Sequence, residues 1–386
     1  MIPYGRQEIT QVDIDAVVDV LHSDWLTQGP VVPRFEKKVA AFCQAKHGVA
    51  FNSATSALHI ACLALELGPG DWLWTSANTF VASANCGLYC GAKVDFVDID
   101  PRTYNMCPQV LSQKLEQAET DGCLPKVVVP VHFGGQPCDM KAIHALAQRY
   151  GFRIIEDASH AIGAQYRGKP VGNCRYSHIT VFSFHPVKII TTGEGGMALT
   201  NDPQIAKHMQ RSCYHGITRD DQDMDQRPKE EIWNYQLIDL GFNYRLTDIQ
   251  AALGLSQLNR LNDFIHKRHA IASRYLTAFQ GLPMTQPWQY PESRSSYHLY
   301  PVRISKQQSG VSQRQSYDAL HRAGIRVNLH YLPVYRHPYY EAMGFSPGYC
   351  PEAEKHYRES ISLPMFPTLS SESQEKVIKT MKALFS

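Results

Sequence analysis

The chain has 386 residues, enough to bury a large core, and we expect it to form two domains. Its formal net charge is +2 and it has no long basic run, which argues against a nucleic-acid or membrane-surface partner. No apolar stretch reaches the roughly 18 residues of a membrane span, and the first residues lack the apolar core of a signal peptide, so we expect a cytoplasmic protein. The cysteines form no CxxC pair and the histidines no HExxH motif, so we expect reduced thiols and no metal site.

The first half of the chain alternates predicted helices with predicted strands. Helices are expected at 11–21, 32–46, 54–68, 79–90 and 140–151, and strands at 48–53, 72–75, 93–99, 126–135 and 152–157. This alternation predicts a mostly parallel sheet flanked by helices, whose ligands bind beyond the carboxyl ends of the strands. No GxGxxG follows any of these strands, so a nicotinamide-dependent dehydrogenase is not favoured.

The second half of the chain does not continue the regular alternation of strands and helices. After a helix at 203–211 and a polar surface loop at 218–231, a long helix is expected at 249–268. Strands at 297–304 and 325–331 with helices at 312–324 and 370–385 then predict a smaller α+β unit. We therefore expect a large domain over residues 1–258 and a small C-terminal domain over residues 259–386.

The segment 178–200 is the one around which the chain is organised. Residues 179–184 alternate as a strand does, and Lys188 follows between Val187 and Ile189. Burying an ammonium group is costly and lowers its pKa, and a free amine is what attacks a carbonyl to form a Schiff base. A surface lysine on a hairpin is the alternative. The glycine-rich turn 191–196, which allows a close backbone approach, favours the chemical role.

Two further junctions carry candidate residues. The small residues 53–56 join a strand to a helix and present free backbone N–H groups, which suits either a phosphate or a plain helix cap. Asp157 and His160 lie just past the strand 152–157, where ligands of a parallel sheet bind. An aspartate at that position is also a common helix N-cap.

In order, these pieces resemble the DegT/DnrJ/EryC1/StrS family of sugar aminotransferases over almost the whole chain. The most specific matches are EDASHA (156–161), FSFHPVKIITTGEGG (182–196) and GFNYRLTDIQAA (241–252). MIPYGRQEIT, LTQGP, NSATSALH and TYN resemble the branch that serves pseudaminic acid biosynthesis. The resemblance implies an α/β, fold-type I (aspartate aminotransferase-like) large domain with a smaller α+β C-terminal domain, and pyridoxal 5'-phosphate as cofactor. Pro186 departs from the family pattern two residues before the lysine.

The resemblance also implies catalytic roles. Lys188 would bind the cofactor as a Schiff base and afterwards move a proton, and Asp157 would pair with the pyridine nitrogen. His160 would lie against the ring or near the phenolic oxygen, where the family has Gln or His, and His there accompanies amination at C4 of the sugar. Phe80 would stack on the ring, although a core aromatic is the commoner fate of such a residue. The lysine itself distinguishes the chain from the sibling dehydratases, in which a histidine replaces it.

For the phosphate, the resemblance points to Ala54, Thr55 and Ser183, and to Asn243 of a neighbouring subunit, which implies a homodimer with shared sites. If the family resemblance is set aside, the sequence around Asn243 predicts only a turn residue before a helix. The substrate residues implied by the resemblance are Glu194, His330 and Tyr331, and the aromatic pair could equally pack the small domain.

The implied reaction moves nitrogen from L-glutamate to UDP-2-acetamido-2,6-dideoxy-β-L-arabino-hexos-4-ulose, giving UDP-4-amino-4,6-dideoxy-N-acetyl-β-L-altrosamine. Another nucleotide-linked 4-keto sugar, of the perosamine or bacillosamine type, is the alternative acceptor. A pyridoxal-phosphate-binding regulator without turnover is the rival from another class. The lysine, the aspartate and the lack of a basic patch argue against that rival.

Overall fold

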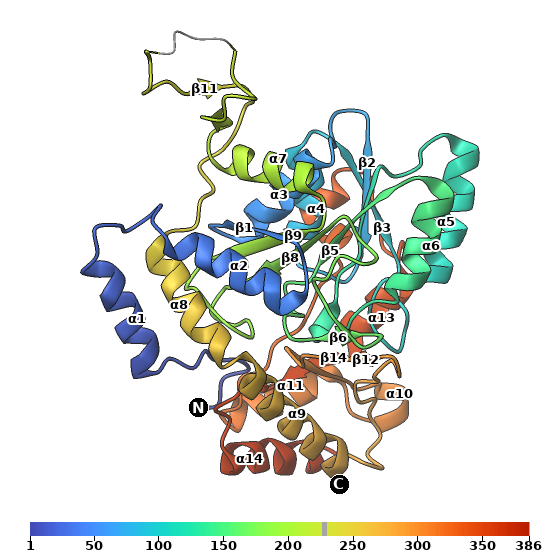
Figure 1. Cartoon of the computed structure of the whole chain (residues 1–386). Coiled ribbons are helices and arrows are strands. Elements are labelled where there is room, and N and C mark those ends of the chain that lie inside the picture. Colours follow the sequence, from blue (N-terminus) through green and yellow to red (C-terminus); the bar gives the residue numbers. More distant parts are fainter. Residues whose placement is uncertain (226–229, 386) are drawn as a thin grey trace.

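The computed structural model describes residues 1–225 and 230–385, and within them a central sheet has seven strands in the order β1-β9-β8-β5-β4-β2-β3 (Figure 1). Its strands are β1 (His47–Phe51), β2 (Trp72–Ser76), β3 (Lys93–Val97), β4 (Val127–Val129), β5 (Arg153–Asp157), β8 (Ile179–Ser183) and β9 (Gly196–Thr200). β3, β2, β4, β5 and β8 are parallel, and β9 runs opposite to both of its neighbours, β8 and β1. The predicted mostly parallel sheet is confirmed.

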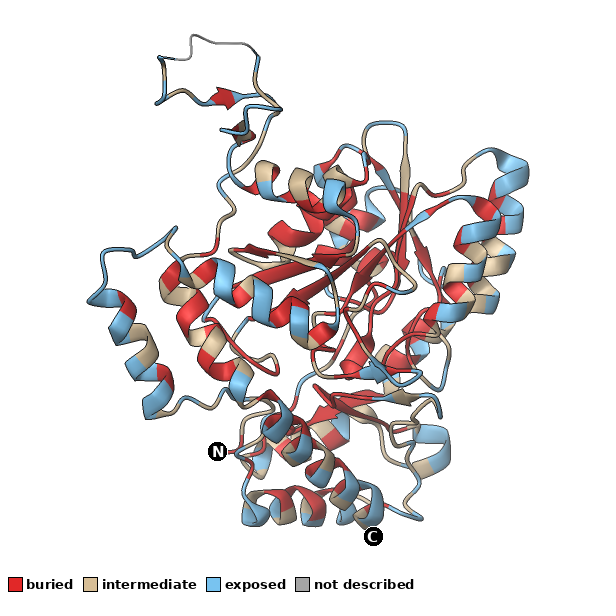
Figure 2. Ribbon diagram, viewed as in Figure 1, coloured by how far each residue is buried: buried red, intermediate tan, exposed pale blue. Residues whose placement is uncertain are grey.

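Helices cover both faces of this sheet. They are α2 (Val31–Cys43), α3 (Ala54–Ala64), α4 (Ala82–Tyr89), α5 (Pro108–Asp121), α6 (Met140–Tyr150) and α7 (Pro203–Cys213). Outside them, α8 (Asp248–Asn259) packs against α2, and α1 (Gln11–Leu21) packs against α8 (Figure 1). Alternate strand residues serve opposite layers: in β5, Ile155 packs with α3 and α4 while Ile154 packs with α5 and α6. Figure 2 shows the result, with buried strands between helices whose outer faces are exposed.

Short sequence signals set the ends of several helices. Thr247 and Gln250 form a reciprocal capping box at the start of α8, and Asp139 and Asp202 accept backbone N–H groups at the starts of α6 and α7. Gly151 adopts a positive φ where α6 ends, a conformation that glycine enters without strain. These local signals explain why most predicted helices in the large unit agree with the structure.

The C-terminal part forms its own hydrophobic cluster. The elements of the C-terminal part are α9 (Leu261–Ala278), β12 (Ser293–Arg294), β13 (Tyr300–Arg303), α10 (Lys306–Ser309), α11 (Gln313–Arg322), α12 (Pro338–Glu341), α13 (Pro351–Glu359), β14 (Ser360–Leu363) and α14 (Ser371–Lys382). Tyr340 of α12 and Ala353 of α13 pack instead into the core of the large unit. β13 pairs antiparallel with β14, and α9, α11 and α14 pack around these two strands. Ile2 packs into the same cluster, so the N-terminal residues reach the C-terminal unit.

Several expectations differ from the structure. The strand expected at 126–135 is shorter, because only β4 (Val127–Val129) is a strand and residues 133–135 form a 3₁₀ turn. The strand expected at 325–331 is absent from the described residues, because Ile325 bridges to Ile2 while Asn328 bridges to Ser362, and no continuous ladder forms. The long helix expected at 249–268 is divided at Arg260, whose guanidinium instead binds Glu8 and Asp13 in and near α1. Helix α5 was not anticipated.

The remaining elements are short. They are β6 (Gln165–Tyr166), β7 (Lys169–Pro170), β10 (Ile217–Thr218), β11 (Gln236–Leu237) and the 3₁₀ turns 133–135 and 334–336. The segment between α7 and α8 that carries the β10–β11 pair stands away from the body of the molecule (Figure 1). The polar surface loop expected at 218–231 falls in this segment, although its residues 226–229 lie outside the described part of the chain.

Candidate active site

A cavity of about 720 Å³ opens beyond the carboxyl ends of the parallel strands, where the strand order predicts ligand binding. Its wall comes from the start of α3, the loop after β2, the end of β5, the β8–β9 turn and the segment before the 3₁₀ turn at 334–336. The polar residues of the wall are Tyr4, Ser53, Thr55, Thr79, Asp157, Ser159, His160, Ser183, His185, Lys188, Glu194, His298, Asn328, His330, Tyr331 and His337. The cavity therefore gathers residues from both halves of the sequence.

Asp157 ends β5 as a buried carboxylate whose two oxygens are both occupied. Ser83 Oγ, in the first turn of α4, donates to Oδ2 at 2.6 Å. Ser159 donates to Oδ1 from its backbone N–H at 3.1 Å and from its Oγ at 2.6 Å. Thr79 Oγ1 lies 2.8 Å from Ser83 Oγ and adds a further hydrogen bond to this network. Asp157 is thus presented to the cavity as a rigid anion with its orientation held from two sides.

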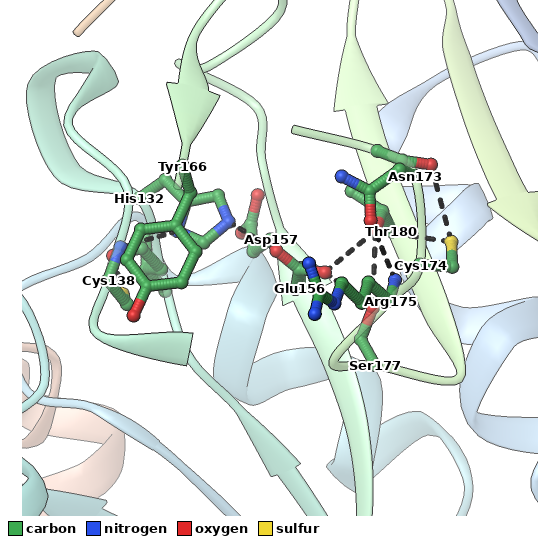
Figure 3. A network of polar contacts seen from close by, with 12 residues as sticks. His132, Cys138, Glu156, Asp157, Tyr166, Asn173, Cys174, Arg175, Ser177 and Thr180 are labelled. Carbon is green, nitrogen blue, oxygen red and sulfur yellow. Dashed lines mark hydrogen bonds and ion pairs between the residues drawn. The ribbon is translucent and has the colours of Figure 1, made fainter. Parts of the chain in front are cut away.

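A second polar network surrounds Glu156, the residue that precedes Asp157 in β5 (Figure 3). Cys138 N–H donates to His132 Nδ1, so a neutral His132 carries its proton on Nε2 and donates it to Glu156 at 2.7 Å. Burial alone raises the pKa of Glu156, but hydrogen bonds from His132, Ser177 and Thr180 outweigh it and hold this pKa below its usual value. The backbone N–H of His132 also donates to Asp157 O at 3.1 Å. Glu156 and His132 thereby hold the strand end that carries Asp157.

Lys188 lies in the turn between β8 and β9, a few residues beyond the strand end where we expected it. The turn is closed at its base, because Phe184 N–H donates to Gly195 O and Thr192 N–H donates to Phe184 O. Burial lowers the pKa of Lys188 to about 8, and the nearby Asp157 carboxylate opposes this by raising it. A larger fraction of free amine is therefore present near neutral pH than at an ordinary surface lysine.

The start of α3 presents unused N–H groups to the cavity. Ser53 Oγ accepts the N–H of Ser56, whereas the N–H groups of Ala54 and Thr55 have no acceptor among the described residues. Ser183 Oγ lines the same region. A Cβ added at Gly196 would lie 2.6 Å from Ala54 N, so glycine permits β9 to pass directly against this helix end. The helix terminus is suited to an anion such as a phosphate.

Three predicted residues lie at the cavity edge or outside it. Phe80 lines the cavity and is 58% exposed, so it is not the core aromatic that base rates favour. Glu194 lines the mouth, with His185 Nε2 3.9 Å from its Oε1. Asn243 is exposed, bridges to Tyr214 and does not line this chain's cavity.

Several residues in or behind the cavity wall were not anticipated from sequence, and four of them illustrate the reason. Tyr4 reaches the cavity wall because Ile2 pairs with the backbone of residues 324–326. Ser83 donates to Asp157 from a helix 74 positions earlier in the chain, and the ring centroid of the buried His298 lies 4.3 Å from that of His160. Only Ser159, inside EDASHA, carried a sequence signal, because the other three depend on long-range contacts.

Comparison with known proteins agrees with this geometry. The family model described as the DegT/DnrJ/EryC1/StrS aminotransferase family matches residues 7–382. The chain belongs to this family. Spore coat polysaccharide biosynthesis protein SpsC of Bacillus subtilis is 39% identical over 384 residues, covering 99% of this chain and 96% of the relative.

Solved structures extend the likeness to the fold. PseC of Helicobacter pylori, an aminotransferase involved in the biosynthesis of pseudoaminic acid, superposes with a TM-score of 0.90 at 30% identity, covering 100% of this chain and 99% of that chain. A candidate sugar aminotransferase of Streptococcus pneumoniae, solved in its PLP form, has a TM-score of 0.88 at 30% identity, covering 99% and 98% of the two chains. The same protein has also been solved in its PMP form. This chain is a sugar aminotransferase that uses pyridoxal phosphate.

The cavity fits that cofactor by its own chemistry. A carboxylate held by three donors, a lysine with a lowered pKa and a helix end with two free N–H groups face one space. Within the described ranges we find no helix long and apolar enough to span a bilayer and no cluster of three or more metal-ligating side chains.

Proposed function

We propose that this chain aminates C4 of a UDP-linked 4-keto-6-deoxy-N-acetylhexosamine with L-glutamate as the donor, in pseudaminic acid biosynthesis. The observation that carries the proposal is the convergence of Lys188, Asp157 and the start of α3 on one cavity. His160 on the wall of that cavity supports C4, because His at this position accompanies C4 amination in the family. The likeness to PseC of Helicobacter pylori supports the pathway.

We assign each polar group of the cavity a task. The free amine of Lys188 would hold the cofactor covalently, and once released it would be placed to accept and return a proton. Asp157 would hold a proton on the pyridine nitrogen, while Ala54, Thr55 and Ser183 would bind the phosphate and Phe80 would cover the ring. Bound pyridoxal phosphate supplies an electron-accepting ring that stabilises negative charge at the carbon losing its proton. Glu194, His330 and Tyr331 face the sugar.

The overall architecture is assigned in the same way. We interpret the central sheet as the fold-type I large domain, residues 1–258, and the C-terminal cluster as the small domain, residues 259–386. The separate hydrophobic cluster around β13 and β14 supports this division. A cytoplasmic location stays a prediction.

The acceptor is tested by turnover on candidate 4-keto sugars. The purified enzyme is expected to aminate the UDP-linked 2-acetamido sugar at a higher kcat/KM than GDP- or dTDP-linked 4-keto sugars. Equal values on all three would contradict the proposed substrate and favour a perosamine- or bacillosamine-type acceptor. L-Glutamate added without any sugar should convert the bound cofactor to its pyridoxamine form, which a regulator without turnover would not do.

The charge of the cavity supports a site shared between two copies. Among the described residues that line it, Lys188 is the only lysine and there is no arginine, although a nucleotide sugar brings a diphosphate. Asn243 lies outside the cavity of its own chain, in the segment that joins α7 to α8. That segment exposes large apolar side chains, including Ile232, Trp233 and Leu240. We propose a homodimer in which Asn243 of one copy reaches the phosphate bound by the other.

Mixed dimers test the shared site. Lys188→Ala and Asn243→Ala are each expected to be nearly inactive as homodimers, while refolding them together should restore up to about a quarter of wild-type activity. The reason is statistical: half of the molecules are mixed dimers, and in each of these one site has both native residues. No recovery in mixtures shown to contain mixed dimers would contradict the sharing of Asn243. A wild-type and Lys188→Ala mixture is the control for subunit exchange.

A further inference from the structure

The segment that leads into α8 is fixed to its own chain by backbone hydrogen bonds. Phe242 N–H donates to Ser212 O, in the last turn of α7, at 2.7 Å. Tyr244 N–H donates to Cys213 O at 3.2 Å, and the carbonyl of Tyr244 accepts the N–H of Asn52 at 2.7 Å. Because Asn52 directly follows β1, the path of this segment is set by the end of α7 on one side and the end of β1 on the other.

The side chain of His59, on α3, packs against this segment. Its ring centroid lies 4.9 Å from that of Phe242, 6.0 Å from that of Tyr244 and 5.5 Å from that of Tyr89 on α4. The rings of Phe242 and Tyr244 stack on each other at 5.0 Å. Edge-to-face and stacked rings at such separations attract each other beyond the gain from apolar burial. His59 is only 6% exposed, so its ring is enclosed by these neighbours, and we call the four rings the His59 cluster.

Asn243 lies between the two aromatic residues of the segment. An antiparallel bridge pairs it with Tyr214, so the backbone is extended here and neighbouring side chains face opposite sides. Phe242 and Tyr244 face His59, and the Asn243 side chain is exposed and does not line the cavity of its own chain. The His59 cluster therefore fixes the face of the segment opposite to the one that presents Asn243.

We propose that His59 positions Asn243 for the phosphate of pyridoxal phosphate bound in the neighbouring copy of the chain. This inference rests on the proposed function with its shared site, and adds a positioning residue to it. His59 does not line the cavity, so it acts only through the segment that it holds. The N–H groups of Ala54 and Thr55 start the same helix, about one and a half turns before His59. Helix α3 would thus serve two phosphates, its own at the first turn and that of the partner through the His59 cluster.

A double-mutant cycle on cofactor binding tests whether His59 acts through Asn243. His59→Ala and Asn243→Ala are each expected to raise the apparent Kd for pyridoxal phosphate, measured by absorption titration, by about tenfold. The double variant should bind within about twofold of Asn243→Ala alone, because the contact that His59 supports is already gone. Losses that multiply to about a hundredfold would show a separate role of His59 and overturn the inference. An unchanged Kd in His59→Ala would also overturn it.

His144→Ala is the matched control for this cycle. His144 lies on α6 with its ring centroid 5.7 Å from that of Tyr176, a similar edge contact, and neither residue lines the cavity. Its apparent Kd should equal that of the wild type. Phe242→Leu removes the aromatic ring from the other side of the same contact and serves if His59→Ala does not fold. It should show the same lack of additivity with Asn243→Ala.

Mixed dimers, isolated with two different tags, show in which copy the defect appears. In a dimer of His59→Ala with Lys188→Ala, the intact lysine receives Asn243 from the copy with native His59. Assayed below the wild-type Kd, this dimer should reach about half the wild-type rate, because one of its two sites is native. In a dimer of wild type with the His59→Ala/Lys188→Ala double variant, the intact lysine receives the poorly held Asn243. That rate should be about tenfold lower, in proportion to the weaker binding. The reverse order of the two rates overturns the inference.

Failure of the proposed function is recognised separately. If wild-type protein binds no pyridoxal phosphate, the proposed function itself is wrong. If mixed dimers of Lys188→Ala with Asn243→Ala are inactive, the shared site is wrong. Either result also overturns the inference, but each comes from a measurement in which His59 is native.

Discussion

Lys188→Ala is expected to abolish covalent attachment of pyridoxal phosphate and to lower turnover by about 10⁴-fold or more. No other lysine lines the cavity in the described parts of the chain, so no second amine is placed to replace it. Borohydride reduction followed by peptide mapping measures the attachment directly. In the wild type the label should fall on the peptide containing Lys188, and in the variant no peptide should carry it.

The control for this experiment is Lys37→Ala, which removes an exposed lysine from α2. It should keep both the label and the turnover of the wild type, because its side chain lies far from the cavity wall. Label on another peptide of Lys188→Ala, with retained activity, would show that the nucleophile is a different residue. A thermal melt of both variants verifies that the fold is kept.

Asp157→Asn is expected to lower kcat/KM by about 10²–10³-fold, because it removes the negative charge that holds the proton on the cofactor ring. Asparagine has nearly the same shape, and the Ser83 and Ser159 hydroxyls that donate to the carboxylate can rotate to meet an amide. The fold should therefore survive, and steady-state kinetics with glutamate and the sugar measure the loss. A kcat/KM near that of the wild type would remove Asp157 from the site.

Ser83→Ala provides the graded comparison. It removes one of the three donors to Asp157 and leaves the charge, so the expected loss is only about tenfold. If Ser83→Ala cost as much as Asp157→Asn, orientation rather than charge would be the main contribution of the carboxylate. The two variants thus separate what the charge does from what its placement does.

Local signals were sufficient wherever a segment depends on its own pattern. The helix expected at 11–21 agrees residue for residue with α1, and the apolar runs of β4 and β5 predicted buried strands of the parallel sheet. The turn that carries Lys188 was also found, because its glycines and the apolar neighbours of the lysine are consecutive in the chain. The motifs EDASHA and GFNYRLTDIQAA predicted the family, and the comparison with the family model then showed it.

Segments whose conformation depends on distant partners could not be predicted in this way. Residues 325–331 have the composition of a strand, yet Ile325 and Asn328 contact different parts of the chain and form only isolated bridges. The sequence predicts one helix where the structure has α8 and α9. Arg260, at the break between them, forms ion pairs with Glu8 and Asp13, which are distant in the sequence. Tertiary contacts outweigh local propensity in both places.

The sequence by itself determined the alternating strands and helices, the lysine turn and the residue types that chemistry needs, because periodicity, caps and turn residues act over a few neighbouring positions. Only the tertiary structure decided that Ser83 donates to Asp157, that Tyr4 reaches the cavity and that His160 Nε2 lies within hydrogen-bond distance of Tyr331 Oη. Such hydrogen bonds require atoms within about 3 Å of each other, and the folding of the whole sheet brings them together across 74 and 171 positions. No local pattern in the sequence predicts which of these distant residues come within hydrogen-bond distance of each other.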